Sequence, residues 1–128
     1  MRLVKRAAIT VTPKQPYIDW ANGLDEDGVK IGEDFEPEKS VYLIGAVTDV
    51  IPFDRDVIVR PYFKAIFEEE LNSWHRRERE WPSSRTYETF LAWFEVEVHS
   101  MVIDLHGGWL IRTEKLLLMV DAHAALRR

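Results

Sequence analysis

The sequence contains no cysteine and no long hydrophobic run. The lack of cysteine excludes a disulfide framework, a thiolate metal site and a cysteine nucleophile. No stretch approaches the roughly 18 apolar residues of a membrane span, and no apolar run of signal-peptide length follows the basic N-terminal residues. No internal repeat or linker divides the chain. We therefore expect a single cytoplasmic domain over residues 1–128 that is not associated with a membrane. Its one hydrophobic core needs no disulfide or metal cross-link.

Negative charge is concentrated in one segment. The formal net charge is −5, whereas residues 25–38 alone carry seven acidic residues against Lys30 and sum to −6. The rest of the chain is nearly neutral, so we do not expect nucleic acid as a partner. Residues 25–39 also contain Gly28, Gly32 and Pro37 and show no apolar periodicity. This pattern predicts an acidic loop at the periphery, of a length that is often functional or disordered.

The first part of the chain predicts two strands and one helix. Apolar residues alternate with polar ones over 3–12, which is typical of a half-buried strand. Thr12 followed by Pro13 indicates the start of a short amphipathic helix, which ends near Asn22 and Gly23. Residues 40–48 are apolar on both faces and predict an interior strand.

The second part predicts helices followed by a strand. Large apolar residues recur every three or four positions over 54–74, but Pro61 interrupts them, so we expect a kink or a helix that begins near Arg60. Thr86 or Ser84 is a candidate cap for a helix over 87–94. From Phe94 the apolar period changes to two, which predicts a third strand of about eleven residues. A turn at 106–108, a short strand or helix entry at 109–112 and a helix over 113–128 complete the chain.

Together these elements indicate an α+β fold. We expect a small sheet of about three strands, with the helices packed mainly on one face of it. Five Trp, four Tyr and six Phe supply much of the buried surface.

Several segments carry a resemblance to a known family. They are residues 13–20, 62–71 with Trp74, Trp81 and Pro82, 85–87, Trp93 and Phe94, and 99–102 with Asp104 and Leu105. Over residues 1 to about 105 the chain resembles a family of small uncharacterised bacterial proteins. The resemblance implies membership of that family and brings no reaction, ligand or catalytic residue with it.

One face of the third strand carries ionisable side chains. Glu95, Glu97 and His99 alternate along it and are expected to share that face. A carboxylate beside an imidazole suits general acid/base catalysis, so one hypothesis is a small hydrolase that uses Glu97 and His99, with Arg85 as an anion-binding group. Solvated residues on an exposed half-strand are the simpler interpretation, because the pattern gives no sign of the burial that separates carboxyl pKa values.

Histidine and aspartate side chains offer ligand types that transition metals bind. His99 and Asp104 lie on the third strand, His106 lies just beyond it, and His75 follows the long helix. His99 and Asp104 are five residues apart, so they point to opposite faces of a regular strand, and no His-Glu-x-x-His motif is present. We expect neither a metal nor a cofactor.

A basic and aromatic stretch joins the predicted helices. Its members are Arg76, Arg77, Arg79 and Arg85, interleaved with Trp74, Trp81 and Tyr87. The combination superficially fits single-stranded nucleic acid, but Glu78 and Glu80 offset the positive charge. We favour packing of Trp74 and Trp81 at the helix junction. The arginines are then expected to pair with Glu68, Glu69, Glu70 and Glu88.

Glu69 and Glu70 are adjacent in a helix whose other face is aromatic. We expect one of them to turn inward toward Arg85. Such a buried pair would have a structural role, because loss of one partner leaves an unpaired buried charge at roughly 3–5 kcal/mol.

No catalytic or cofactor motif stands out. The leading hypothesis is therefore a non-enzymatic cytoplasmic protein-interaction module, whose partner is another protein or a second copy of the chain. The acid/base hydrolase is the alternative. The candidate binding or acid/base residues are Glu70, Arg85, Glu97, His99 and Asp104.

Overall fold

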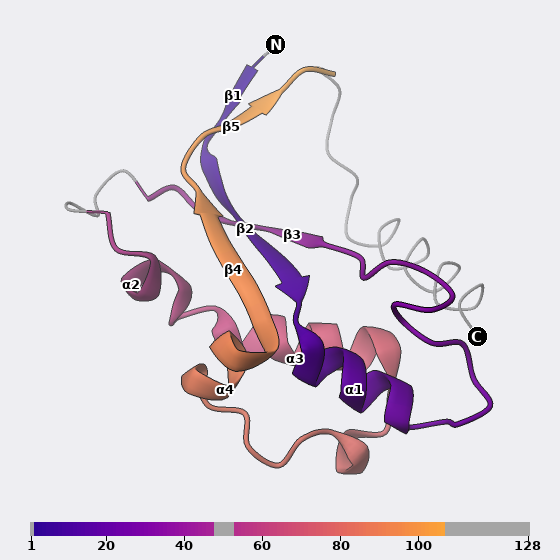
Figure 1. The fold of residues 1–128 in the computed structure, drawn as a ribbon. Helices are drawn as coiled ribbons and strands as arrows, with labels where there is room; N and C mark the ends of the chain where they lie inside the picture. The colour runs from indigo at the N-terminus through magenta and orange to yellow at the C-terminus, as the bar shows by residue number, and fades with distance from the viewer. Residues whose placement is uncertain (1, 48–52, 107–128) are drawn as a thin grey trace.

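The computed structural model describes residues 2–47 and 53–106 (Figure 1). Over these residues the chain forms a three-stranded sheet, a separate two-stranded ribbon and four α-helices, so the predicted α+β class is confirmed. Within the same ranges no helix is long and apolar enough to cross a bilayer. The turn predicted at 106–108 lies mostly outside the described residues. The segment 109–112, the helix predicted over 113–128 and the end of the strand predicted over 40–48 also lie outside them.

The elements follow one another in the order β1 (Arg2–Val4), β2 (Arg6–Pro13), α1 (Gln15–Gly23), β3 (Ser40–Gly45), α2 (Arg55–Val59), α3 (Phe63–Trp74), the 3₁₀ turn η1 (Glu78–Glu80), α4 (Tyr87–Trp93), β4 (Phe94–His99) and β5 (Val102–Asp104).

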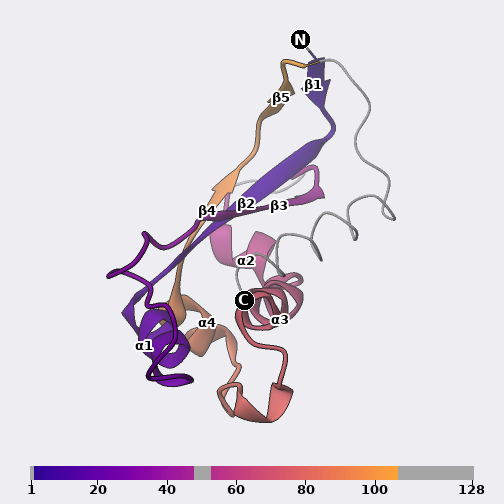
Figure 2. The same ribbon diagram turned by 90° about the vertical axis from the view of Figure 1, so that its right-hand side faces the viewer.

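The three-stranded sheet has the order β3-β2-β4 and is antiparallel throughout. Alternate residues of the central strand, Ala7, Ile9 and Val11, are fully buried. They face the helices, which lie together on one side of the sheet in Figures 1 and 2. One face of the sheet is therefore an inner face that forms the core, and the other is an outer face without helices among the described residues.

Beyond the sheet, the chain continues as a two-stranded ribbon. β1 pairs with β5, with Leu3 opposite Ile103, and the ribbon projects from the body of the molecule (Figure 1). Between ribbon and sheet, residues 5–7 lie opposite residues 100–101, so the N-terminal strand carries one extra residue, a β-bulge. The strand predicted over 3–12 and the third predicted strand are each divided in two at this point.

The helix predicted over 54–74 is divided at Pro61. Proline has no amide hydrogen and clashes with the preceding turn, so α2 ends at Val59 and α3 begins at Phe63. Neither predicted alternative, a kink or a helix that begins near Arg60, describes this complete break. Asp54 starts α2 by accepting hydrogen bonds from two amides of its first turn, at 2.9 and 3.3 Å.

One predicted helix cap is confirmed and another is wrong. Thr86 Oγ1 accepts a 3.1 Å hydrogen bond from the amide three residues further along and begins α4. Thr12 does not begin a helix, because β2 extends through Pro13. α1 starts later and has Pro16 in its first turn, where the missing amide loses no helical hydrogen bond.

Three phenylalanines from different elements form the centre of the core. Phe67 of α3, Phe90 of α4 and Phe94 of β4 are at most 1% exposed, and their ring centroids lie 5.4–5.7 Å apart. Tilted and edge-on rings at such distances stabilise a core by about 0.5–1.5 kcal/mol per pair beyond their burial. The phenylalanine cluster therefore joins two helices to the sheet.

Tryptophan indoles tie the helix ends together. Trp74 Nε1 donates to the carbonyl of Ala21 (3.2 Å), and Trp20 Nε1 donates to that of Glu80 (2.9 Å). Trp81 Nε1 donates to the carbonyl of His75 (2.7 Å). These bonds connect α1 with the end of α3 and with η1, as expected for tryptophans packed at a helix junction.

The acidic loop is anchored by apolar residues that the sequence pattern did not reveal. Ile31 is buried in the core, and the Asn22 side chain both accepts from and donates to its backbone (2.9 and 3.1 Å). Gly32 has φ of 92°, which favours glycine, and its amide donates to the Phe35 carbonyl at 2.7 Å. The Phe35 ring then lies 6.0 Å from Trp74.

We expect Phe90→Ala to lower the free energy of unfolding by about 3–5 kcal/mol, because it leaves a cavity at the centre of the phenylalanine cluster. Urea denaturation followed by circular dichroism measures this change. Phe53→Ala is the matched control: Phe53 is 54% exposed, so its loss should stay within about 0.5 kcal/mol. Equal effects of the two substitutions would contradict this core.

Candidate functional site

The outer face of the sheet brings together two of the predicted acid/base residues. Glu97 lies opposite Thr10 across β2 and β4, and His99 follows two residues later on the same face. His99 Nε2 is 3.1 Å from Thr10 Oγ1 and 3.8 Å from Glu97 Oε2. Thr10 was not predicted as a member of this group. The predicted sharing of one face by Glu97 and His99 is confirmed.

The geometry of this group limits its chemistry. In a nucleophile–histidine–carboxylate triad the two imidazole nitrogens face different partners, one the nucleophile and the other the orienting carboxylate. Here Thr10 and Glu97 both approach Nε2 of His99. The His99 and Glu97 side chains are also 45% and 62% exposed. The acid/base hydrolase stays an untested prediction without a specific geometric feature in its favour.

The other predicted site residues lie elsewhere. The Arg85 guanidinium lies 5.6 Å from the centre of the Trp81 ring, and its Nη2 is 3.8 Å from Glu78 Oε1. Arg85 precedes α4 in the helical layer, whereas His99 lies on the outer face of the sheet. Asp104 belongs to the ribbon, where its Oδ1 accepts a hydrogen bond from the His106 amide at 2.9 Å. The five candidates therefore do not form one site.

Glu70 is the buried carboxylate, and it is the one charged residue that is buried in the described part of the chain, at 6% exposure. Its Oε2 accepts a hydrogen bond from the Tyr42 hydroxyl of β3. The expectation that one of the adjacent glutamates turns inward holds for Glu70. Its carboxylate meets Tyr42, however, while the contacts of Arg85 described above are with Trp81 and Glu78. Sequence spacing did not identify Tyr42, because β3 and α3 are distant in the chain.

Two tyrosines have altered acidity. Burial raises the pKa of Tyr42, and the nearby Glu70 carboxylate raises it further. Burial and then the hydrogen bond to Asp56 raise the pKa of Tyr87 to about 12. The same hydrogen bond, followed by that of Arg55, lowers the pKa of the Asp56 carboxyl. Both tyrosines therefore stay protonated when they donate to a carboxylate.

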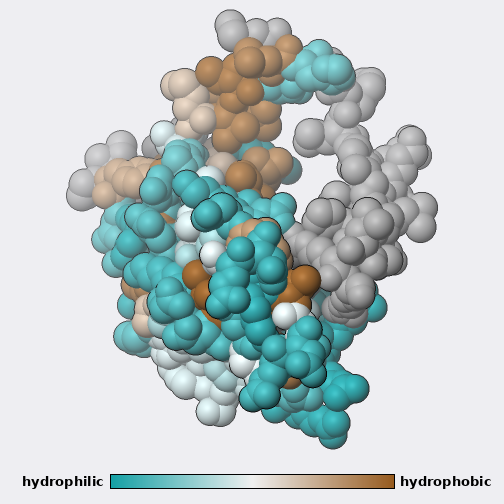
Figure 3. Space-filling view, turned by 45° about the vertical axis from the view of Figure 1, so that its right-hand side comes forward, coloured by the Kyte–Doolittle hydropathy of each residue, from teal (hydrophilic) through white to brown (hydrophobic). Residues whose placement is uncertain are grey.

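The ribbon exposes a set of large apolar side chains. They are Leu3, Met101, Ile103 and Leu105, between 45% and 76% exposed, and we call them the ribbon patch. Leu3 of β1 lies opposite Ile103 of β5. Met101, Ile103 and Leu105 occupy every second position along β5 and its flanks. Figure 3 shows this hydrophobic area at the end of the ribbon, above a mostly hydrophilic face of the body.

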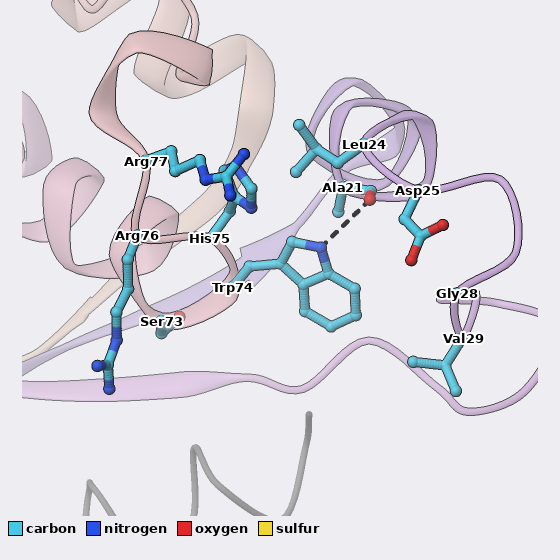
Figure 4. Close-up of a pocket in the computed structure, with 10 residues that line it drawn as sticks. All are labelled: Ala21, Leu24, Asp25, Gly28, Val29, Ser73, Trp74, His75, Arg76 and Arg77. Atoms are coloured by element: carbon cyan, nitrogen blue, oxygen red, sulfur yellow. Dashed lines mark hydrogen bonds between the residues drawn. The ribbon is translucent and has the colours of Figure 1, made fainter.

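A pocket of about 510 Å³ lies between the ends of α1 and α3 (Figure 4). It is lined by Ala21, Leu24, Asp25, Gly28, Val29, Ser73, Trp74, His75, Arg76 and Arg77. We call it the Trp74 pocket, because the indole, held by its bond to the Ala21 carbonyl, lies at its centre. No sequence pattern predicts this pocket, because its walls come from two segments about fifty residues apart.

The charged groups beside the Trp74 pocket are partly paired. Arg77 Nη1 is 3.5 Å from Glu80 Oε1, and His75 Nε2 is 3.2 Å from Glu80 Oε2 without hydrogen-bonding geometry. The predicted partners Glu68, Glu69, Glu70 and Glu88 are wrong for Arg77 and Arg85, which lie beside Glu80 and Glu78. Over the residues that the structure describes, no group of three or more histidine, aspartate or glutamate side chains is arranged to hold a metal ion.

Comparison of the chain with protein-family models, with curated proteins and with solved structures finds no match in any of the three.

We expect Tyr42→Phe to lower the free energy of unfolding at neutral pH by about 1–3 kcal/mol, because Glu70 loses a hydrogen-bond donor while it stays buried. The pKa of Tyr42 is raised on folding, so its contribution is fully present below the unfolded tyrosine pKa of about 10 and is lost as the pH rises above it. The stability difference between wild type and Tyr42→Phe should therefore shrink in alkali.

Urea denaturation at a series of pH values measures this difference. Tyr62→Phe is the matched control, because Tyr62 is 37% exposed and its hydroxyl makes no hydrogen bond to residues 2–47 or 53–106. We expect no pH-dependent difference for it. A stability difference for Tyr42→Phe that stays constant from neutral to alkaline pH would contradict the proposed linkage.

Proposed function

We propose that this protein is a non-enzymatic, cytoplasmic protein-interaction module that self-associates through its ribbon patch. The observation that carries the proposal is the exposure of four large apolar side chains on a two-stranded ribbon that projects from the body. Apolar residues gathered in this way are typical of an interaction surface, whereas scattered ones need no explanation. The absence of cysteine supports a reducing, cytoplasmic location.

The physical need for a partner follows from the ribbon itself. An isolated two-stranded ribbon is marginally stable in water, because it lacks a third strand or a helix to cover its apolar face. Burying one of the larger aliphatic side chains contributes about 1.5–3 kcal/mol. A partner that covers the ribbon patch would therefore stabilise the ribbon and bind at the same time.

A second copy of the chain fits this surface. Arg2 and Asp104 lie opposite each other on the other side of the ribbon, so the four residues of the ribbon patch carry no charge. In a two-fold symmetric dimer the same patch meets itself, and the apolar side chains of one copy cover those of the other. An uncharged apolar patch is self-complementary in this arrangement, because no like charges are brought together.

Nucleic acid is a poorer candidate partner. The indole nitrogens of Trp74 and Trp81 already donate to backbone carbonyls, and Arg85 lies over the Trp81 ring and beside Glu78. These groups are therefore engaged within the protein rather than presented for stacking and phosphate contact. The resemblance to a family of small bacterial proteins remains a prediction and adds no other partner.

We expect the wild-type protein to be a dimer and Ile103→Lys to weaken dimerisation by at least about 100-fold, because one buried aliphatic residue is lost from each copy and a charge replaces it. Light scattering coupled to size-exclusion chromatography over a dilution series measures this change. Leu3→Lys, on the facing strand, should act in the same direction.

Val57→Lys is the matched control, because Val57 is 57% exposed but lies on α2, away from the ribbon. It should leave the dimer intact. Circular dichroism establishes that each variant is folded. A wild-type protein that stays monomeric at every concentration, or an equal loss of dimer with Val57→Lys, would overturn the proposal.

A further inference from the structure

We propose that the Trp74 pocket binds a small zwitterion with an apolar side chain, of the class of free aromatic or branched α-amino acids. The site is separate from the ribbon patch and does not depend on self-association. Its size of about 510 Å³ lies within the range of roughly 300–1,000 Å³ that is usual for small-molecule sites.

The apolar part of the pocket suits a hydrophobic side chain. Leu24 and Val29 contribute aliphatic surface from the α1 end and the acidic loop, and Trp74 contributes its ring. The hydrogen bond from Trp74 Nε1 to the Ala21 carbonyl fixes the orientation of that ring. The Phe35 ring, whose centroid lies 6.0 Å from that of Trp74, supports the indole ring. The aromatic surface is therefore in place before a ligand arrives, which reduces the ordering cost of binding.

The charged part of the pocket carries both signs. In Figure 4, Asp25 and Arg77 lie on either side of Leu24, above the Trp74 ring. An α-ammonium group would pair with the Asp25 carboxylate, and the adjacent α-carboxylate would pair with the Arg77 guanidinium. A ligand with only one of these charges would make only one of the two pairs.

The position of Asp25 is held by the local backbone. Its Oδ1 accepts a 3.0 Å hydrogen bond from the Asp27 amide, and the Gly28 amide donates to its carbonyl at 3.2 Å. A Cβ atom at Gly28 would approach Asp25 Oδ2 to 3.0 Å, which is tighter than ordinary contact. Glycine at this position therefore allows the carboxylate to lie close to the loop, at the edge of the pocket.

The experiment compares three probes that share one ring. L-phenylalanine carries both charges, 3-phenylpropionate lacks the ammonium group and 2-phenylethylamine lacks the carboxylate. Binding is followed in nitrogen–proton correlation spectra through the indole N–H of Trp74, which is assigned by its loss in Trp74→Phe. We expect L-phenylalanine to bind with a dissociation constant on the order of 1 mM and at least about tenfold more tightly than either analogue.

Two charge variants test the assigned roles. Asp25→Asn should reduce the affinity for L-phenylalanine to that for 3-phenylpropionate and leave the latter unchanged. Arg77→Gln should reduce the affinity for L-phenylalanine to that for 2-phenylethylamine and leave the affinity for 2-phenylethylamine unchanged. The matched controls are Glu33→Gln, in the same loop but outside the pocket, and Arg79→Gln in η1; both should bind as the wild type does.

Three results would overturn the proposal. The first is an unchanged Trp74 signal with L-phenylalanine up to its solubility limit. The second is equal affinity for the three probes, which would indicate apolar binding without recognition of charge. The third is an equal effect of the pocket variants and their controls. Because Ile103→Lys leaves the pocket residues intact, binding measured in that variant separates this proposal from self-association.

Discussion

The packing of Phe67 against Phe90 and Phe94 determines where the other parts of the molecule lie. It fixes α3 against the inner face of the sheet, with α4 beside it. Glu70 follows three residues after Phe67 and is carried toward β3, where it meets Tyr42. The last residue of α3 is Trp74, so the same packing places one wall of the pocket. A loosened phenylalanine cluster would therefore disturb the buried carboxylate and the pocket together.

Local pattern in the sequence was a good guide where one neighbour decides the structure. Alternation of apolar residues identified the inner face of β2, and the cap at Thr86 followed from its own hydroxyl. It failed where a distant strand competes for the same residues. Pairing with β4 keeps Pro13 in the sheet and delays α1. The burial of Ile31 also depends on Asn22, whose side chain binds its backbone from the end of a helix.

The candidate site residues show the same division. Glu97 and His99 were placed together because a strand repeats every two residues. Thr10 joins them only through the register of β2 on β4, which no local pattern contains. The partner of Glu70 was misjudged for a related reason, since the sequence shows that a helical carboxylate can turn inward but not which strand lies opposite. The Trp74 pocket could not be predicted from sequence, because its walls come together only where the ends of α1 and α3 meet in the fold.

The β-bulge at residues 5–7 determines the composition of the two ribbon faces. Even-numbered residues of β2 point to the outer face of the sheet, as do Glu97 and His99 of β4. The inserted residue reverses this parity in the first strand, so Leu3 accompanies Ile103, and Arg2 and Val4 take the other side. If the same residues continued the sheet register without a bulge, Leu3 would lie opposite Asp104 and Val4 opposite Ile103, so each ribbon face would mix apolar and charged side chains. The bulge, rather than the hydrophobicity of the terminus alone, therefore gathers the apolar side chains on one ribbon face.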